Sequence, residues 1–321
     1  MIADLASVLV CPSCHGKLRW EVPETPECSG CGAKYGVQDG VASFRVECTP
    51  DDWEHVDSEL LRHLDAEPDG RRELLESPAG ELGAVDLFFR GLLLEEEGSY
   101  PQAERCIHVA TERSYRHEYL AALRAEIAWL TARVARQHKV LDVASGRGTL
   151  VEAMLADRGP SSVLVASDLS PLVLHRMRRR FAACGPVGHV EYVAFDVAAT
   201  PFRDSSMDTA TTLLGLPNLA DPESALRELR RAIGGRLLAV HYFIADDDPN
   251  RESATALGSA PMLLREECLA MFARAGWSVE VKNEIVAPAS PTPVGRILEG
   301  WGIDGFPVVD TDLTWCVLVA S

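Results

Sequence analysis

Four cysteines near the start of the sequence have the spacing of metal ligands. Cys11-Pro-Ser-Cys14 and Cys28-Ser-Gly-Cys31 are two C-x-x-C pairs separated by 13 residues. Four thiolates at this spacing can close tetrahedrally around Zn²⁺, and a site with four protein ligands is structural because no position remains for water. An iron site fits less well, since its cysteine pairs usually lie further apart. The sequence therefore predicts a structural zinc site made of Cys11, Cys14, Cys28 and Cys31.

A second set of candidate ligand-binding residues begins at Val140. The run Val140-Leu141-Asp142-Val143-Ala144-Ser145-Gly146-Arg147-Gly148 is an apolar strand that leads into a glycine-containing turn. Glycines let the backbone approach a ligand closely, and a helix after the turn offers free N–H groups. The next strand ends in Asp168, where an acid can bind ribose hydroxyls. The third ends in Phe195-Asp196-Val197. Singly, each acid could be a helix cap or a surface residue; three strand ends together favour one ligand.

This succession resembles class I S-adenosylmethionine-dependent methyltransferases, from Lys139 to the C-terminus. The resemblance implies S-adenosylmethionine as cofactor, with the glycine turn on its methionine part, the second acid on its ribose and the third beside its adenine. The cofactor-binding residues implied in this way are Asp142, Ala144, Ser145, Gly146, Gly148, Asp168, Leu169, Asp196, Val197 and Leu214. Ala144 departs from the family, which often has a glycine there. That change is mild and leaves the prediction standing.

The cysteine segment has a resemblance of its own. Its context, Leu9-Val10-Cys11-Pro12-Ser13-Cys14 and Tyr35-Gly36-Val37, resembles the small zinc-ribbon activator subunits of tRNA and release-factor methyltransferases. It is also similar to the N-terminal ribbon of bacterial rRNA guanine methyltransferases. Gly36 departs from the Tyr-Pro-Val of that family. Such ribbons act as scaffolds or recognition modules. Because residues 1–46 carry 5 acidic and 4 basic side chains, we expect this ribbon to dock onto its own chain.

Hydrophobic periodicity divides the sequence into three segments: a zinc ribbon (1–46), a helical linker or cap (47–137) and a cofactor-binding domain (138–321). In the second, Leu120, Leu123, Ile127, Leu130 and Val134 form one stripe of a helix, and Val56, Leu60, Leu61 and Leu64 suggest another. In the third, strands are predicted at 139–144, 163–168, 190–195, 208–214, 236–243, 278–286 and 313–320, and helices near 150–157, 171–183, 223–233 and 265–275. This alternation predicts an α/β, doubly wound, Rossmann-like sheet of seven strands, with ligands beyond the carboxyl ends of its strands.

Charge and composition limit the partners. The net charge is −17, and residues 47–100 alone hold 16 acidic and 4 basic side chains. A protein that grips phosphates needs clustered Lys and Arg, so the balance argues against a nucleic-acid substrate. No apolar run is long enough to span a membrane, and the first residues lack a basic segment followed by a cleavage site. We therefore expect a cytoplasmic protein that acts on a small molecule without membrane contact. A homodimer is one possibility that the sequence leaves open.

Several polar residues could contact a methyl acceptor. The loop after the fourth strand, which begins at Leu214, should border the transferred methyl group, and it lacks the Asp/Asn-Pro-Pro-Tyr box of adenine and amide N-methyltransferases. Asn218 lies in that loop, where it could orient an acceptor or simply complete a turn. His241 and Tyr242 end the fifth strand, and only one of the two should face the site. Candidates from the helix before the first strand are Tyr115, His117 and Tyr119.

Three functions remain open at this point. The first is methylation of an O or N atom of a metabolite or natural product. The second is methylation of rRNA or tRNA, suggested by the ribbon and by a basic cluster that is either an RNA-binding patch or a solvated helix face. The cluster comprises Arg176, Arg178, Arg179 and Arg180. The third is a scaffold, or an enzyme that uses this fold for another reaction.

Overall fold

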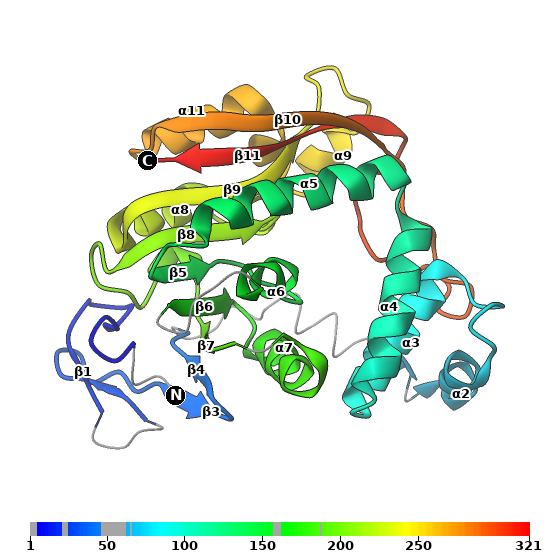
Figure 1. Cartoon of the computed structure of the whole chain (residues 1–321), viewed down its shortest axis with the longest axis horizontal. Coiled ribbons are helices and arrows are strands. Elements are labelled where there is room, and N and C mark those ends of the chain that lie inside the picture. The colour runs from blue at the N-terminus through cyan, green and yellow to red at the C-terminus, as the bar shows by residue number, and fades with distance from the viewer. Residues whose placement is uncertain (1–4, 21–24, 46–61, 65, 157–161, 187) are drawn as a thin grey trace.

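The protein is described by a computed structural model covering residues 5–20, 25–45, 62–64, 66–156, 162–186 and 188–321. Within these residues the main sheet has nine strands in the order β10-β11-β9-β8-β5-β6-β7-β4-β3 (Figure 1). The strands are β3 (Gly36–Gln38), β4 (Val41–Ser43), β5 (Lys139–Asp142), β6 (Val163–Asp168), β7 (Val190–Ala194), β8 (Met207–Leu213), β9 (Ile233–Phe243), β10 (Val279–Ala289) and β11 (Thr311–Ala320).

The seven strands from β5 to β11 form the predicted doubly wound sheet. β5, β6, β7, β8 and β9 are mutually parallel, whereas β11 pairs antiparallel with both β9 and β10. The central strands are apolar on both faces, as in parallel sheets covered by helices: Val140, Leu141, Leu164 and Val165 are fully buried. All the predicted strands are present, with ends shifted by up to three residues.

The sheet is larger than the seven predicted strands, because the hairpin β3–β4 from the N-terminal segment adds two strands at its edge. β4 pairs in parallel with β7, with Val41 opposite Tyr192 and Ser43 opposite Ala194. Phe44 continues the pairing by donating its N–H to the Ala194 carbonyl at 2.8 Å. Residues 1–46 were predicted as a separate ribbon, and single-segment patterning cannot show that two of its strands belong to a distant sheet.

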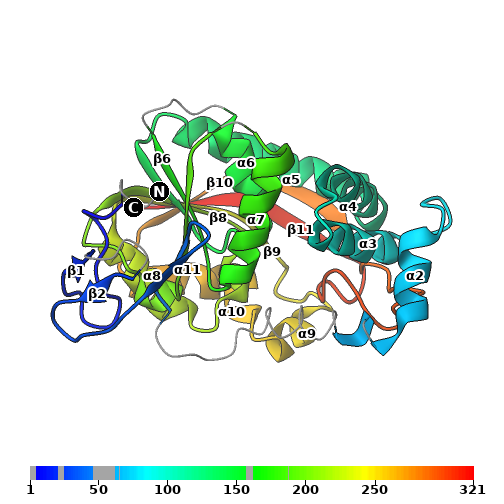
Figure 2. The same ribbon diagram turned by 90° about the horizontal axis from the view of Figure 1, so that it is seen from below.

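Helices cover both faces of the sheet (Figure 2). One face is packed by α5 (His117–Val134), α6 (Thr149–Leu155) and α7 (Pro171–Cys184), whose buried Leu120, Leu150 and Leu174 share one core. The other face is packed by α8 (Pro222–Ala232) and α11 (Arg265–Arg274), through Leu226 and Phe272. The short α9 (Arg251–Ala256) and α10 (Ala260–Leu263) follow β9. The helices predicted near 150, 171, 223 and 265 are all present.

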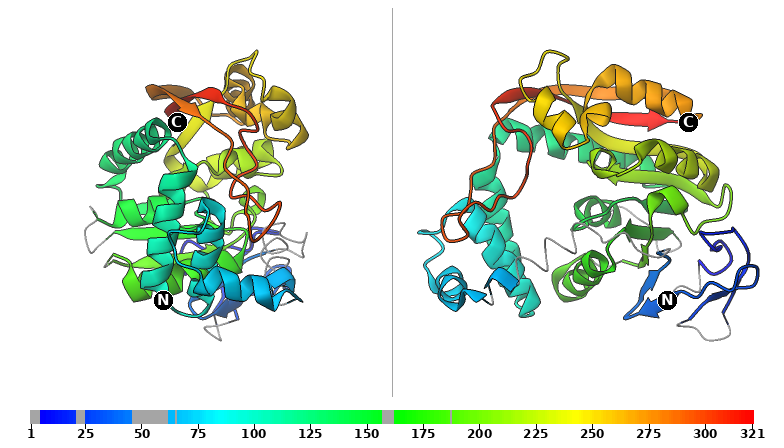
Figure 3. Two further views of the ribbon diagram at one scale, coloured as in Figure 1. Left: turned by 90° about the vertical axis from the view of Figure 1, so that its right-hand side faces the viewer. Right: turned by 180° about the vertical axis from the view of Figure 1, so that it is seen from behind.

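The N-terminal ribbon lies against the sheet at the end opposite the cap (Figure 3). It contains the small hairpin of β1 (Leu18–Arg19) and β2 (Glu27–Cys28). The Val10 N–H donates to the Pro201 carbonyl at 2.8 Å, and the Arg203 N–H donates to the Val8 carbonyl at 2.8 Å. Leu5 and Leu9 are buried in the same core as residues of the sheet. Docking of the ribbon onto its own chain is thus confirmed.

The cap consists of α2 (Pro68–Glu76), α3 (Ala84–Glu96) and α4 (Tyr100–Ser114). It packs on the connection between β10 and β11, residues 290–310, through an apolar cluster that includes Phe89 and Leu298. The buried carboxylate of Asp86 accepts the backbone N–H groups of Arg296 and Ile297 at 3.1–3.2 Å. The helix predicted from Val56 to Leu64 lies largely outside the described residues. Among those described, no helix has both the length and the apolarity to cross a membrane.

Candidate functional site

The turn after β5 and the acid that ends β6 are directly bonded to each other. The backbone N–H of Gly146 donates to Oδ2 of Asp168 at 3.0 Å, and the N–H of Ser145 donates to the Ser167 carbonyl at 2.8 Å. Oδ1 of Asp168 accepts the N–H of Ser170 at 3.1 Å, at the start of α7. The predicted glycine turn and ribose-side acid therefore form one rigid unit at the carboxyl edge of the sheet.

Left-handed backbone conformations shape this turn. Ala144, Gly146 and Gly148 have φ values of +51°, +51° and +84°. Glycine adopts such angles without strain, whereas a Cβ atom makes them costly, so the family's usual glycine at position 144 has a conformational reason. At Gly148 a Cβ would lie 2.7 Å from Sδ of Met177, so this glycine allows α6 and α7 to approach closely.

The carboxylate of Asp142 faces the protein interior. It is 1% exposed and accepts a hydrogen bond from the Thr211 hydroxyl at 2.7 Å, across to β8. Burial raises the pKa of this carboxyl to about 7. The hydroxyls of Ser145 and Ser167 bond its backbone carbonyl at 3.1 and 2.7 Å. The sequence predicts that Asp142 lines the methionine part of the cofactor. The carboxylate of Asp142 does not face that side; it bonds Thr211 and so connects the turn to β8.

The third strand end lies beside the second. The Phe195 N–H donates to the Asp168 carbonyl at 3.0 Å, which places Asp196 and Val197 next to the ribose-side acid. Asp196 is exposed and accepts the Ala198 N–H at 2.8 Å, while Val197 is 7% exposed. Leu169 is 40% exposed, so an apolar side chain is accessible to a ligand between the two acids.

The loop after β8 borders the same edge. Leu214 has a φ of +54°, and its N–H donates to the Val240 carbonyl at 3.0 Å. A Cβ at Gly215 would lie 2.8 Å from that of Ala144, so this loop touches the glycine turn. Asn218 is exposed and donates to the Leu214 carbonyl at 3.3 Å. This hydrogen bond completes the turn, which is one of the two roles expected for Asn218, and it gives no support to contact with a methyl acceptor.

His241 is not available as a base at the mouth of the site. The imidazole is 0% exposed, and its Nε2 donates to the Met262 carbonyl at 2.8 Å on the α10 side of the sheet. Burial lowers the pKa of the ring to about 4. The prediction of His241 as a catalytic residue is therefore corrected, because the alternation of β9 turns Tyr242 to the α5 side instead. His117 is exposed at the start of α5, and among the described residues its side chain makes no contact that links it to the site.

Tyr115, Tyr119 and Tyr242 meet in an aromatic cluster with Phe306 and Trp315. Its ring-centroid distances are 4.9 Å for Tyr115–Tyr119, 4.9 Å for Tyr119–Trp315, 5.3 Å for Tyr242–Trp315 and 6.4 Å for Tyr242–Phe306. The Tyr115 hydroxyl donates to the carboxylate of Asp304, which lies two residues before Phe306. Sequence reasoning missed Asp304, Phe306 and Trp315, because no local pattern links residues 115, 242 and 304.

Arg147, inside the glycine turn, binds the cap. Its guanidinium donates two hydrogen bonds to Glu95 of α3, at 2.9 and 2.7 Å, and a third to Glu104 of α4 at 3.3 Å. The basic cluster of α7 joins this network. Arg180 is 6% exposed and pairs with Glu152 at 3.0 Å, and Arg176 pairs with Glu96 at 2.6 Å. Neither interpretation offered for the cluster holds for Arg176 and Arg180, which connect the acidic cap to the sheet.

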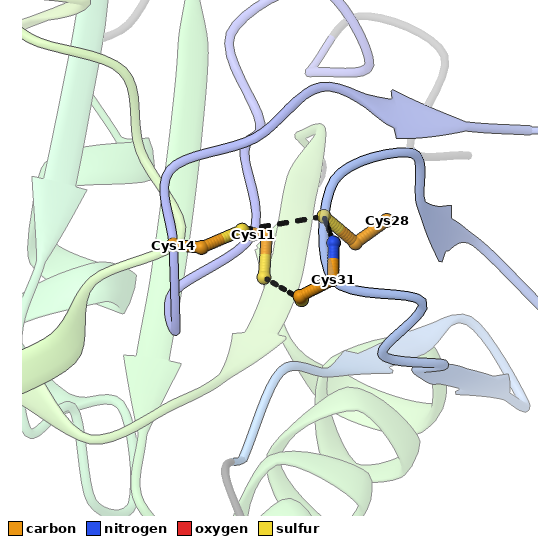
Figure 4. Close-up of side chains that lie close together, drawn as sticks. All are labelled: Cys11, Cys14, Cys28 and Cys31. Carbon is orange, nitrogen blue, oxygen red and sulfur yellow. Dashed lines mark hydrogen bonds between the residues drawn. The ribbon is translucent and has the colours of Figure 1, made fainter.

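The four cysteines of the ribbon converge on one point (Figure 4). Their sulfur atoms all lie within 4.8 Å of one another, with 3.6 Å between Cys11 and Cys31 and 3.5 Å between Cys14 and Cys28. Tetrahedral Zn–S bonds of about 2.3 Å would separate the sulfurs by about 3.8 Å, so the set fits zinc. The Gly30 N–H donates to the Cys28 sulfur at 3.3 Å, and the Tyr35 hydroxyl lies 3.0 Å from the Cys11 sulfur. A Cβ at Gly16 would come within 3.0 Å of the Cys28 sulfur.

Comparison with known proteins locates a family within the chain. Residues 140–234 match the family model described as a methyltransferase domain. The ubiquinone/menaquinone biosynthesis C-methyltransferase UbiE of Cronobacter sakazakii is 39% identical over 111 residues, which are 34% of this chain and 44% of that protein. UbiE of Pasteurella multocida is 35% identical over 111 residues, with 34% and 41% covered. The chain thus spans less than half the length of these curated relatives.

Among solved structures, the YcgJ protein of Bacillus subtilis aligns at 17% identity and a TM-score of 0.46, covering 61% of this chain and 97% of its own. The family match and the curated relatives confirm, for residues 140–234, the methyltransferase domain that the strand-end glycines and acids predict.

Proposed function

We propose that this chain, which carries a class I S-adenosylmethionine-dependent methyltransferase domain, transfers a methyl group from that cofactor to an O or N atom of a small molecule. The observation that carries the proposal is the bond from the Gly146 N–H to Asp168, which joins two cofactor-binding strand ends. The exposed Leu169 and Asp196 beside them suit an adenine base, which needs an apolar surface and a polar partner at its edge.

Methyl transfer from a sulfonium is an in-line displacement. The acceptor attacks the methyl carbon, the C–S bond breaks with its electron pair going to sulfur, and the acceptor's proton leaves. Most of the catalytic task is positioning, which can contribute about 7–11 kcal/mol in favourable cases. In this chain the loop at Leu214 would border the methyl group, and the aromatic cluster would hold the acceptor at the neighbouring end of β9.

Zinc is part of the same proposal. The four cysteines would hold one Zn²⁺ that supports the fold of the ribbon, and with four protein ligands it would take no part in the chemistry. Bound zinc would hold the loop that contains Val8 and Val10 in place. This loop is bonded to the main domain through Arg203 and Pro201. The convergent sulfurs support this assignment.

The experiment is cofactor binding followed by product analysis. Calorimetry on the zinc-loaded chain should detect binding of S-adenosylhomocysteine. Asp168→Asn should lower the affinity for this ligand about tenfold or more, because the ribose hydroxyls lose a charged hydrogen-bond acceptor. The matched control is Asp221→Asn, since Asp221 also accepts a helix N-terminal N–H, from Ser224 at 3.0 Å, but on α8. Unchanged binding in Asp168→Asn would contradict the proposal.

The atom that is methylated needs its own measurement. The curated relatives are named C-methyltransferases, so transfer to carbon is the outcome against which O or N transfer must be tested. With ¹³C-methyl-labelled cofactor, the chemical shift of the product's methyl carbon distinguishes the three. A carbon-bound methyl would overturn the proposal of O or N transfer and leave the methyltransferase assignment intact.

RNA methylation has less support. Arg176 and Arg180 are engaged by Glu96, Glu152 and Glu104, so half of the cluster is neutralised within the chain. The ribbon is bound to the sheet along β4. A gel shift at low salt, where phosphate contacts are strongest, should show no retention of rRNA or tRNA fragments.

A further inference from the structure

The aromatic cluster has the layout of a binding surface with a floor and a rim. Tyr119 and Trp315 are 9% and 0% exposed and form the floor. Tyr115, Tyr242 and Phe306 are only half-buried, and Asp304 is exposed. The ring contacts run from Tyr115 through the floor to Tyr242 and Phe306, and the Tyr115–Asp304 hydrogen bond closes the circuit.

Two groups of this surface have polar capacity left. The indole Nε1 of Trp315 is buried and has no acceptor among the residues that the structure describes. Tyr242 is half-buried and carries a hydroxyl that can both donate and accept a hydrogen bond.

The cluster stands where a methyl acceptor would have to be. Tyr242 is the penultimate residue of β9, and β9 pairs with β8, whose following loop touches the glycine turn. Neighbouring strands are about 4.8 Å apart, so Tyr242 is roughly two strand spacings, about 10 Å, from the turn after β5. The cluster forms where the start of α5, the end of β9, the connection before β11 and β11 itself come together.

The electrostatic character of the surface selects the charge of its ligand. Aromatic faces carry negative partial charge and attract cations within about 6 Å, and Asp304 adds a carboxylate. The guanidinium of Arg116, next in sequence to Tyr115, is engaged by Asp310 at 3.3 Å and by Ser290 at 2.6 Å. Asp304 is therefore not neutralised by it.

We infer that the acceptor is an amine on an apolar body, held as its cation by Asp304 and the faces of Tyr115, Tyr242 and Phe306. This inference rests on the proposed methyl transfer. The bound ammonium gives one proton to the Asp304 carboxylate, and the freed nitrogen lone pair attacks the methyl carbon of the sulfonium. The C–S bond breaks toward sulfur, which leaves the methylated ammonium and S-adenosylhomocysteine, and Asp304 passes its proton to water.

The test uses probes that share a ring and differ in charge. Tyramine is the cation, 4-methylphenol the neutral analogue and 4-hydroxyphenylacetate the anion; benzylamine with toluene, and tryptamine with 3-methylindole, extend the set to other sizes. Binding is measured by calorimetry on the full chain, loaded with zinc and saturated with S-adenosylhomocysteine. At least one amine should bind about tenfold or more tightly than its neutral partner, and the anion should bind most weakly.

Variants separate the charge of Asp304 from its place in the fold. Asp304→Asn should remove the preference for the amine while leaving the affinity of the neutral probe unchanged. Glu299→Gln, which removes an exposed acid of the same connection and leaves the Arg116–Asp310 pair intact, should keep the preference. The inference is overturned if no amine binds more tightly than its neutral partner, or if Asp304→Asn retains the preference. Failure of S-adenosylhomocysteine to bind would instead remove the proposed function.

Discussion

The guanidinium of Arg147 lies in the glycine turn and grips the carboxylate of Glu95 with two hydrogen bonds, at 2.9 and 2.7 Å. Glu95 belongs to α3 of the cap, more than fifty residues earlier in the chain, and its side chain is 5% exposed. Paired bonds of this kind fix orientation as well as distance. The cap is thereby attached to the loop that would hold the cofactor's methionine part.

Breaking this pair should loosen both the cap and the cofactor site. We expect Glu95→Gln to lower the free energy of unfolding by about 1–3 kcal/mol, because Arg147 loses a buried partner while Glu104 still compensates in part. The affinity for S-adenosylhomocysteine should fall with it. Thermal denaturation with and without that ligand measures both. Glu97→Gln, an exposed acid that pairs with Arg71, is the control, and an equal effect there would contradict the link.

Removing zinc should weaken cofactor binding. The ribbon carries β4, whose carboxyl end runs beside that of β7 and so beside Asp196. Loss of the metal frees the ribbon, and the adenine-side strand then loses its neighbour. We expect Cys14→Ser to release zinc, detected with a chromogenic chelator, and to reduce the affinity for S-adenosylhomocysteine. Cys184→Ser, an exposed cysteine on α7, should change neither. Full affinity in a metal-free chain would show that the ribbon is independent of the site.

The buried His241 should make the fold sensitive to acid. Its pKa is depressed from 6.5 to about 4 by burial, so its contribution to stability is complete above pH 6.5 and disappears as the pH falls toward 4. At pH 4.5 the loss should be about 2–3 kcal/mol. We expect His241→Gln to be less stable at pH 7 but to show a shallower decline in melting temperature below pH 6.5. His108→Gln, exposed on α4, should follow the parent curve. A parallel decline in both variants would contradict this prediction.

Ala144 should be a site where glycine stabilises. Its φ of +51° costs an alanine roughly 1 kcal/mol, partly offset by the greater freedom of glycine in the unfolded chain. We expect Ala144→Gly to raise the free energy of unfolding by about 0.5 kcal/mol, measured by chemical denaturation. Ala122→Gly, in the interior of α5, should lower it by about 1 kcal/mol. If both substitutions destabilised the protein, the strain assigned to Ala144 would be absent.

The parts of the molecule that sequence predicts well are those set by local patterning. The apolar runs around Leu141 and Val165 fix the parallel strands, and the turn residues after them fix where Asp168 and Gly146 lie. Burial is harder to foresee. Asp142 and His241 have the residue types of a functional site, yet pairing with Thr211 and Met262 makes both structural.

Long-range partners were beyond local patterning altogether. The sequence around Arg147 does not predict its contact with Glu95, and the sequence around Tyr115 does not predict its contact with Asp304. Each pair forms only after separate segments fold together. The strand β4 is an intermediate case: the apolar, β-prone residues from Val41 onward predict a short strand, but only the folded sheet reveals that its partner is β7.

That last pairing has a consequence during synthesis. Val41 must meet Tyr192, about 150 residues downstream, and ribosomes add about 5–20 residues per second. For roughly 8–30 seconds the edge of β4 that will pair with β7 is therefore uncovered, and an uncovered strand edge can pair with other chains. The cysteines that converge in the ribbon, Cys11 to Cys31, are all synthesised before this edge is covered.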